Sequence, residues 1–120
     1  MLNQMVIVGR LVREPELKET ENGKRVTNIT LAIPRSYKNT EGEYDTDFLD
    51  VTLWNGVAEN TAEYVKKGDL LGIKGRITSK SIDTDGVSKN EMILVAEKVT
   101  FLSSKKEYDK EEKIDKEKDI

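Results

Sequence analysis

The chain has 120 residues, 20 Lys and Arg against 23 Asp and Glu, a net charge of −3, and neither His nor Cys. This length suits one domain with an appendage, because single domains commonly run to roughly 100–150 residues. Without Cys and His, disulfides, zinc fingers, cysteine proteases and Ser-His-Asp triads are excluded. The sequence has no run near the ~20 apolar residues of a membrane span and no basic signal-peptide start. The lack of Cys fits a reducing cytoplasm.

The composition changes near residue 104. Residues 105–120 contain six Lys and seven acidic residues, and their apolar side chains are Tyr108, Ile114 and Ile120. Such a segment cannot bury enough apolar surface to offset the entropy of ordering it. We therefore predict a domain over residues 1–104 and a solvated, flexible charged tail over residues 105–120. A docked helix is the alternative, because Glu112 and Lys116 have the i,i+4 spacing of a helical ion pair.

Five segments show the hydrophobic pattern of β-strands. We expect these strands over residues 1–11, 26–33, 47–54, 69–79 and 92–102. Pro34 directly follows the second segment and should end it, bend it or place it at a sheet edge. The pairs Asn22-Gly23 and Asp85-Gly86 predict tight turns before the second strand and before the fifth.

Alternation of apolar and polar residues assigns the two faces of the last three strands. In the third strand the core face carries Leu49, Val51 and Leu53, and the outer face carries Phe48, Asp50, Thr52 and Trp54. In the fourth strand the core face carries Leu71, Ile73 and Ile77, and the outer face carries Lys74, Arg76 and Thr78. In the fifth strand we expect the core face to carry Ile93, Val95, Val99 and Phe101.

One helix is predicted between the third and fourth strands. Asn55 has the side chain of an N-cap, and Gly68 suits the position after the last turn. Lys66 and Lys67 would lie in the last turn, where they favour the helix dipole. The resulting order is β-β-β-α-β-β with short strands. It predicts an all-β fold with one short helix, a five-stranded Greek-key barrel of the OB-fold type.

Aromatic residues interleave with cations on the predicted outer surface. The residues concerned are Phe48 and Trp54 on the third strand, Lys74 and Arg76 on the fourth, and Tyr37 between Arg35 and Lys38. Rings stack on bases, and Lys and Arg bind phosphates, so this pattern favours single-stranded nucleic acid even at a slightly negative net charge. A structural interpretation stays open, in which a hairpin or a subunit covers either ring, Tyr37 packs a loop, and the cations are simply solvated.

The order of segments along residues 1–104 resembles the bacterial-type single-stranded DNA-binding protein (SSB) family. The segments that carry this resemblance are MLNQMVIVGRL (1–11), EPEL (14–17), VTNITLA (26–32), DF (47–48), VTLW (51–54), AE (58–59), YVKKG (64–68) and GRI (75–77). None of them is diagnostic alone, and their common order makes the resemblance strong.

The resemblance implies an OB-fold homotetramer in the cytoplasm that binds single-stranded DNA without sequence specificity in replication, recombination and repair. By position, the family's base-stacking aromatics correspond to Tyr37, Phe48 and Trp54. The expected phosphate contacts are Arg10, Arg35, Lys38, Lys74, Arg76 and Lys80. We expect no cofactor, no metal site and no membrane partner.

This sequence departs from the family pattern at two places. Ile82 stands where many relatives carry an aromatic residue, so one stacking platform would be missing. Relatives tend to end in a long tail whose acidic tip, closed by Pro-Phe, docks replication and repair proteins, whereas this sequence ends Lys118-Asp119-Ile120. We therefore do not expect docking of replication or recombination proteins by that route. The short tail also fits a phage or mobile-element version.

Two other classes of function remain. One is an OB-fold module for protein interaction, of the primosome type and with weak DNA affinity, which Ile82 and the near-neutral charge favour. The other is an enzyme, because Asp45, Asp47 and Asp50 form a cluster of the kind that holds Mg²⁺ in nucleases. Alternation sends Asp47 and Asp50 to opposite faces, which disfavours such a site. The segment 83–86 begins like a calcium loop but lacks the later ligands, so we expect a hairpin turn and no catalysis.

Overall fold

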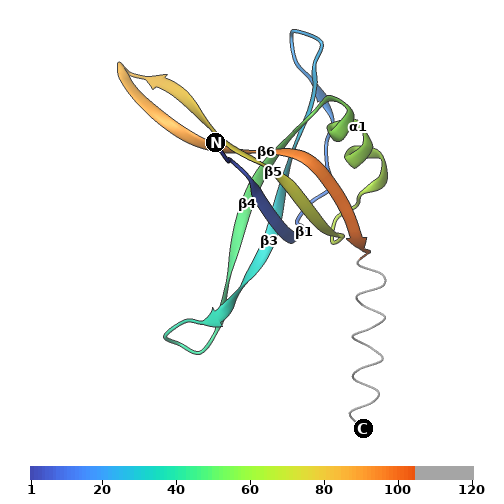
Figure 1. The fold of residues 1–120 in the computed structure, drawn as a ribbon, viewed down its shortest axis with the longest axis vertical. Helices are drawn as coiled ribbons and strands as arrows, with labels where there is room; N and C mark the ends of the chain where they lie inside the picture. Colours follow the sequence, from blue (N-terminus) through green and yellow to red (C-terminus); the bar gives the residue numbers. More distant parts are fainter. Residues whose placement is uncertain (105–120) are drawn as a thin grey trace.

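The computed structural model describes residues 1–104, and the predicted tail lies outside the described residues. The elements in chain order (Figure 1) are β1 (Met5–Leu11), β2 (Lys18–Glu19), β3 (Arg25–Lys38), β4 (Tyr44–Trp54), α1 (Asn55–Tyr64), β5 (Leu70–Thr84) and β6 (Val87–Ser103). The five long strands and the helix are those predicted, and the two-residue β2 is an addition at the sheet edge.

The strands close into a barrel. The sheet order is β1-β5-β6-β4-β3-β2, and a further pairing of β1 with β3 joins the two ends of the five long strands. All pairings are antiparallel except that of β4 with β6, which is parallel at Val51 and Thr52. This topology confirms the predicted five-stranded barrel with one helix inserted between β4 and β5.

The barrel interior is filled by aliphatic side chains from every long strand. The almost fully buried ones are Leu11, Ile29, Leu31, Val51, Leu53, Leu71 and Ile73. Helix α1 packs against β3, β4 and β6 and adds Ala58 to this core. The alternation predicted for β4 is confirmed at its end, because Val51 and Leu53 are buried while Phe48 and Trp54 are exposed. Leu49, also predicted to face the core, is half-buried and lines an open groove instead.

Two long hairpins extend beyond the barrel in different directions, as Figure 1 shows. The first joins β3 to β4 and continues past Pro34, which pairs with Thr46 before a register shift. The second joins β5 to β6 at a turn in which Asp85 and Gly86 both have positive φ. The predicted strands were too short here, because both faces of each projecting arm meet solvent and their residues show no alternation of polarity.

The ends of the helix differ from the prediction. Trp54 occupies the N-cap position without a side-chain cap hydrogen bond, and Asn55 is the first helical residue, with φ of 52°. The helix ends at Tyr64, so Lys66 and Lys67 lie beyond its last turn. An Asp69 carboxylate oxygen accepts a hydrogen bond from the Lys66 N–H at 2.8 Å. This contact stabilises a separate turn there, in which Gly68 bonds to the Leu11 carbonyl instead of ending the helix.

A bulge in β6 reverses the faces predicted for part of that strand. Lys74 of β5 pairs with Lys98, whereas Gly75 pairs with Ala96, so Glu97 is an extra residue. As a result Leu94 and Ala96 face the core, and Ile93 and Val95, predicted to be inward, lie on the outer face. Val99 packs against the core as predicted, but Phe101, opposite Leu71, is half exposed.

Ile77 lies beyond the same bulge and is also less buried than predicted. It lines an apolar groove at the barrel mouth beside Met92 and Leu94, and 37% of its surface is exposed. The projecting hairpin begins at this level, so no further strand covers it. Among residues 1–104, no helix is long and apolar enough to cross a membrane.

The crossing of β5 and β6 at Gly75 should not tolerate a side chain. A Cβ on Gly75 would collide with the backbone carbonyl of Val95, and backbone cannot rotate away. We expect Gly75→Ala to lower the free energy of unfolding by about 1–3 kcal/mol, as overpacking does. Urea unfolding measures this change.

The matched control is Gly56→Ala in the first turn of α1. A Cβ there would have no neighbour within 4 Å in the described part of the chain. We expect unchanged stability or a gain of about 0.5–1 kcal/mol, because alanine restricts the unfolded chain. Equal unfolding midpoints for Gly75→Ala and the wild type would contradict the proposed collision.

Candidate nucleic-acid interface

A groove crosses the outer face of four strands. Its lining residues are Val26 and Asn28 of β3, Thr52 and Trp54 of β4, Ile93 and Val95 of β6, and Thr78 and Lys80 of β5. Strand register explains this gathering, because Asn28, Thr52, Val95 and Arg76 are successive Cα partners across the sheet. The fold therefore brings Trp54 and Lys80 to one groove, and Arg76, the Cα partner of Val95, lies on the same face of the sheet.

Trp54 is the aromatic residue of this groove. It stands at the last position of β4, opposite Val26, and 39% of its surface is exposed. The Thr52 hydroxyl, one outward position earlier, donates to the Asn28 side-chain oxygen at 2.9 Å. The groove thus combines an accessible indole, apolar walls from Val26 and Val95, and a cation from Lys80. This combination suits an unstacked base with its phosphate.

Phe48 lies on the same outer face of β4 but lines a second groove. That groove, at the barrel mouth, is lined by Met5, Ile7, Phe48, Leu49, Asp50, Ile77, Met92 and Leu94. Trp54 lies six positions after Phe48, which corresponds to about 20 Å along an extended strand. The two rings are therefore separate platforms rather than one stack.

Asp50 sits between these two platforms on β4. One of its carboxylate oxygens accepts a hydrogen bond from the Thr30 hydroxyl at 2.6 Å, and Arg13 donates to that hydroxyl at 3.1 Å. The carboxylate is thereby held against β3. It adds a fixed negative charge to a face on which the sequence predicts contacts with DNA.

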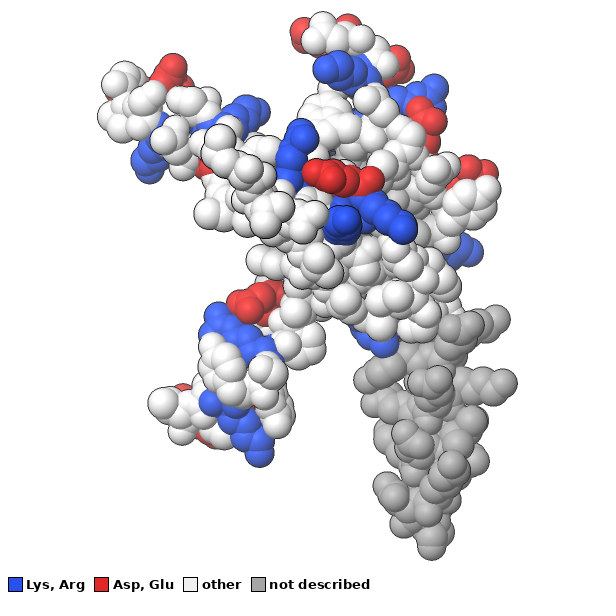
Figure 2. All heavy atoms as spheres, in the orientation of Figure 1, with Lys and Arg blue, Asp and Glu red and all other residues white. Residues whose placement is uncertain are grey.

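The β3–β4 hairpin carries the third predicted aromatic residue, Tyr37, with 64% of its surface exposed. Lys38, next to it, places its ammonium group 5.7 Å from the ring centre of Tyr44. Figure 2 shows blue and red atoms side by side on this hairpin at the lower left. The hairpin is therefore a mixed-charge arm rather than a uniformly basic one.

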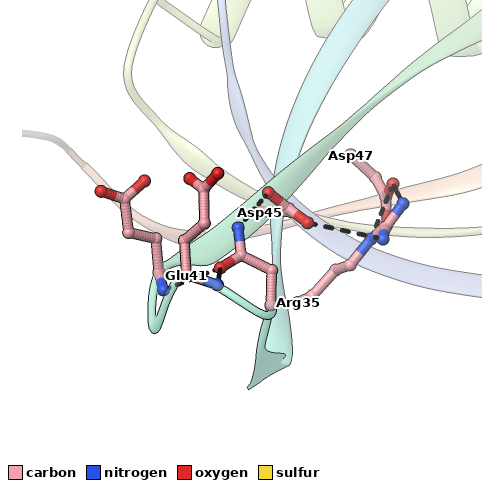
Figure 3. A network of polar contacts seen from close by, with 6 residues as sticks. Arg35, Glu41, Asp45 and Asp47 are labelled. Atoms are coloured by element: carbon pink, nitrogen blue, oxygen red, sulfur yellow. Dashed lines mark hydrogen bonds and ion pairs between the residues drawn. The ribbon is translucent and has the colours of Figure 1, made fainter.

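Arg35 on this hairpin is engaged by two carboxylates (Figure 3). Its Nη2 and Nε donate to Asp47 at 2.9 Å and 3.2 Å, and its Nη1 lies 3.8 Å from Asp45. The hydrogen bond with Asp47 raises the pKa of Arg35 and lowers the pKa of Asp47. Because the pair is solvent-exposed, it contributes little to stability.

The remaining predicted cations lie elsewhere on the barrel. Arg10 is half-buried on β1 and donates to the Gly68 carbonyl at 3.0 Å. Lys74 is exposed on β5, between Val6 of β1 and Lys98 of β6. Ile82, at the predicted missing platform, lies on the β5–β6 hairpin opposite Lys89. The predicted site residues therefore occupy four regions: two grooves, the β3–β4 hairpin and the β1–β5 surface.

Sequence reasoning missed several residues of these grooves. Ile93 and Val95 were assigned to the core because nothing in the sequence indicates the bulge at Glu97. Met92, which is exposed and lines the groove with Phe48, was missed for the same reason, because the extra residue Glu97 changes the face on which it lies. The Arg35–Asp47 pair had a partial signal in the sequence, since opposite charges flank the polar segment between the second and third predicted strands. The register shift in β3 hides which of these residues meet.

The closed barrel, the helix between β4 and β5 and the outer face with exposed rings define an OB-fold binding protein. Comparison with known proteins gives the family. The single-strand binding protein family matches residues 2–102, and the chain belongs to that family.

Curated relatives agree with this assignment. Single-stranded DNA-binding protein B of Bacillus subtilis is 42% identical over 106 residues, 88% of this chain and 94% of that protein. The single-stranded DNA-binding protein of Halalkalibacterium halodurans is 47% identical over 103 residues, and the chain spans 61% of its length. Single-stranded DNA-binding protein 1 of Clostridium acetobutylicum is 41% identical over 108 residues, 98% of that protein.

A solved structure gives the same fold. A deletion mutant of the single-stranded DNA binding protein from Thermus aquaticus superposes with a TM-score of 0.71 at 26% sequence identity. The match covers 85% of this chain and 51% of that one. The likeness confirms the OB-fold, and the chain spans about half the length of the Thermus protein.

Proposed function

We propose that this chain binds single-stranded DNA without sequence specificity and protects it during replication, recombination and repair. The observation that carries the proposal is the groove of Trp54, in which an exposed indole stands beside apolar walls and Lys80. The names of the relatives support the choice of single-stranded DNA as the ligand.

The mechanism is stacking on rings combined with contacts to phosphates. Each base stacked on an aromatic ring contributes about 1–3 kcal/mol, and every base offers a π-face, so binding is independent of sequence. A duplex hides these faces, which favours the single strand. Trp54, Phe48 and Tyr37 act as the three platforms, and Arg76 and Lys80 neutralise phosphates near Trp54.

The proposed function is binding without catalysis or cofactor. The carboxylates that raised the possibility of a nuclease site are engaged separately, Asp47 by Arg35 and Asp50 by Thr30. In the described part of the chain, no three Asp or Glu residues gather in a way that could hold a metal ion. The family as a whole is one of binding proteins. We place this activity in the cytoplasm, where single-stranded DNA arises.

We also propose that the chain assembles into a homotetramer through β1. Val6 and Val8 lie on the outer face of this strand, with 74% and 47% of their surfaces exposed. Within residues 1–104, β3 pairs with β1 at Arg10 and Leu11, which leaves one edge of residues 5–8 open. An apolar strand with an open edge is a surface that a second copy can cover.

A protein-interaction module with weak DNA affinity is the second candidate. The groove of Phe48 favours it, because exposed Met92 and Ile77 make that groove apolar and its one charged residue is Asp50. Such a groove suits an apolar side chain of a protein partner as well as a base. The two candidates differ in whether the isolated chain binds single-stranded DNA.

Trp54 fluorescence distinguishes them, because Trp54 is the single tryptophan of the sequence. We expect oligo(dT) to quench this emission, a duplex of equal length to quench it far less, and added salt to weaken the effect. Unchanged emission together with no shift in a gel would reject the proposed function and favour the interaction module.

Removal of the indole should weaken binding without unfolding the chain. We expect Trp54→Ala to reduce the affinity for oligo(dT) by about 1–3 kcal/mol, the value of one stacked base. Fluorescence anisotropy of a labelled oligonucleotide measures the loss. Tyr64→Ala is the control, because Tyr64 is an even more exposed aromatic residue, at the end of α1, and lines neither groove. Equal losses for the two variants would argue against stacking on Trp54.

A charge on β1 should disrupt the proposed assembly. We expect Val6→Lys to lower the mass measured by light scattering, because a buried ammonium group has no partner in an apolar interface. Val87→Lys serves as the control, since Val87 is similarly exposed but lies at the tip of the β5–β6 hairpin. A wild-type mass equal to one chain, or a Val6→Lys mass equal to the wild type, would contradict association through β1.

A further inference from the structure

Asp47 occupies the edge of Arg35 that would bind a phosphate. A guanidinium recognises phosphate most strongly through two parallel N–H donors. In this structure Nε and Nη2 of Arg35 both donate to the Asp47 carboxylate, at 3.2 Å and 2.9 Å (Figure 3). The carboxylate thus occupies one of the two edges through which the guanidinium can bind a phosphate with paired donors. The other edge shares Nη2 with Asp47 and has Asp45 3.8 Å from Nη1.

The second carboxylate near Arg35 is held in place by a different partner. Asp45 accepts a hydrogen bond from the Asn39 side-chain amide at 3.1 Å and stays 3.8 Å from Nη1 of Arg35. The Asn39 side-chain oxygen in turn accepts bonds from the backbone N–H groups of Glu41 and Glu43. This network orders the hairpin turn, so Asp47 is the acidic residue that directly satisfies Arg35.

We propose that Asp47 is an internal competitor for the phosphate at Arg35, and that it determines how strongly the β3–β4 hairpin binds DNA by charge alone. This inference rests on the proposed binding of single-stranded DNA. A phosphate that reaches Arg35 must displace Asp47, which then needs a cation from the solvent. When a phosphate binds Arg35 in the wild type, the cation released from the DNA is offset by the cation that Asp47 takes up, so almost no counterion is released overall.

The competition has a consequence for specificity. A strand that offers only charge gains little at Arg35, because one anion replaces another. A single strand also offers a base to Tyr37, which is exposed two residues further along β3. The pair of Arg35 with Asp47 should thus favour strands that stack on the hairpin over duplexes that do not.

The variant that tests this is Asp47→Asn, which keeps the shape of the side chain and removes the competing charge. Released Arg35 should add one phosphate contact, which steepens the slope of log K against log salt by about 0.7. The ratio of variant to wild-type affinity for oligo(dT) should then be about threefold larger at ~50 mM than at ~200 mM salt. The ratio of variant to wild-type affinity should be larger for a duplex than for oligo(dT).

Glu43→Gln is the matched control, because it removes the same charge from the same hairpin. Within the described residues, the Glu43 side chain makes no ion pair with Arg35. We expect its salt slope to equal that of the wild type. The exposed pair contributes little to stability, so thermal unfolding should show that both variants remain folded.

A double variant decides whether Asp47 acts through Arg35. We expect Asp47→Asn to change neither slope nor duplex binding when Arg35→Gln is already present. An equal slope change in that background, or equal effects of Asp47→Asn and Glu43→Gln, would overturn the inference. These outcomes differ from failure of the proposed function, in which the wild type itself would not bind oligo(dT).

Discussion

The close approach of three strands at Gly75 is the constraint on which the rest of the structure depends. Gly75 of β5 pairs with Met5 on one side and with Ala96 on the other, and it has no room for a side chain. The extra residue Glu97 lies at the same level, so β6 changes face there. Before Gly75, β5 pairs with β1. After it, β6 still pairs with β4 at Leu94 and Val95, and beyond these residues β5 and β6 continue as the projecting hairpin. The reversal of faces also puts Val95, rather than a core residue, in register with Thr52 and Arg76.

Strand β4 links this framework to the surface that we propose binds DNA. Its inward residues Val51 and Leu53 are fully buried, which fixes the outward direction of Phe48 and Trp54 without any contact to a ligand. The parallel pairing of β4 with β6 at Thr52 then places Trp54 over strands that come from the distant end of the chain. Such a groove is preorganised, because the strands that form its walls are held in place by their inward side chains in the core.

These features can be predicted from the sequence only in segments where apolar and polar residues alternate regularly. The strand over residues 47–54 alternates regularly, and its two faces, with both aromatic residues, are confirmed. Strand ends beyond Pro34 and Ser79 could not be predicted, because arms that meet solvent on both sides show no pattern. The bulge at Glu97 could not be predicted either, since the segment 92–102 is apolar enough to alternate in either phase. The partner of Arg35 depends on a register shift, which is a property of the folded hairpin.

The distribution of charge resolves the apparent conflict between a net charge of −3 and a ligand that is a polyanion. A cation that already pairs with a carboxylate, as Arg35 does, attracts a DNA phosphate only weakly. The electrostatic attraction between the whole protein and DNA is therefore weak. In the proposed mechanism, the attraction then comes from exposed rings, whose interaction with bases is insensitive to net charge, together with the local cations Arg76 and Lys80. By the mechanism that we propose, a protein arranged in this way distinguishes single strands from duplexes by the accessibility of base faces. On the role that we propose for Asp47, its acidic residues sharpen that distinction, because they reduce the part of the binding energy that both kinds of DNA share.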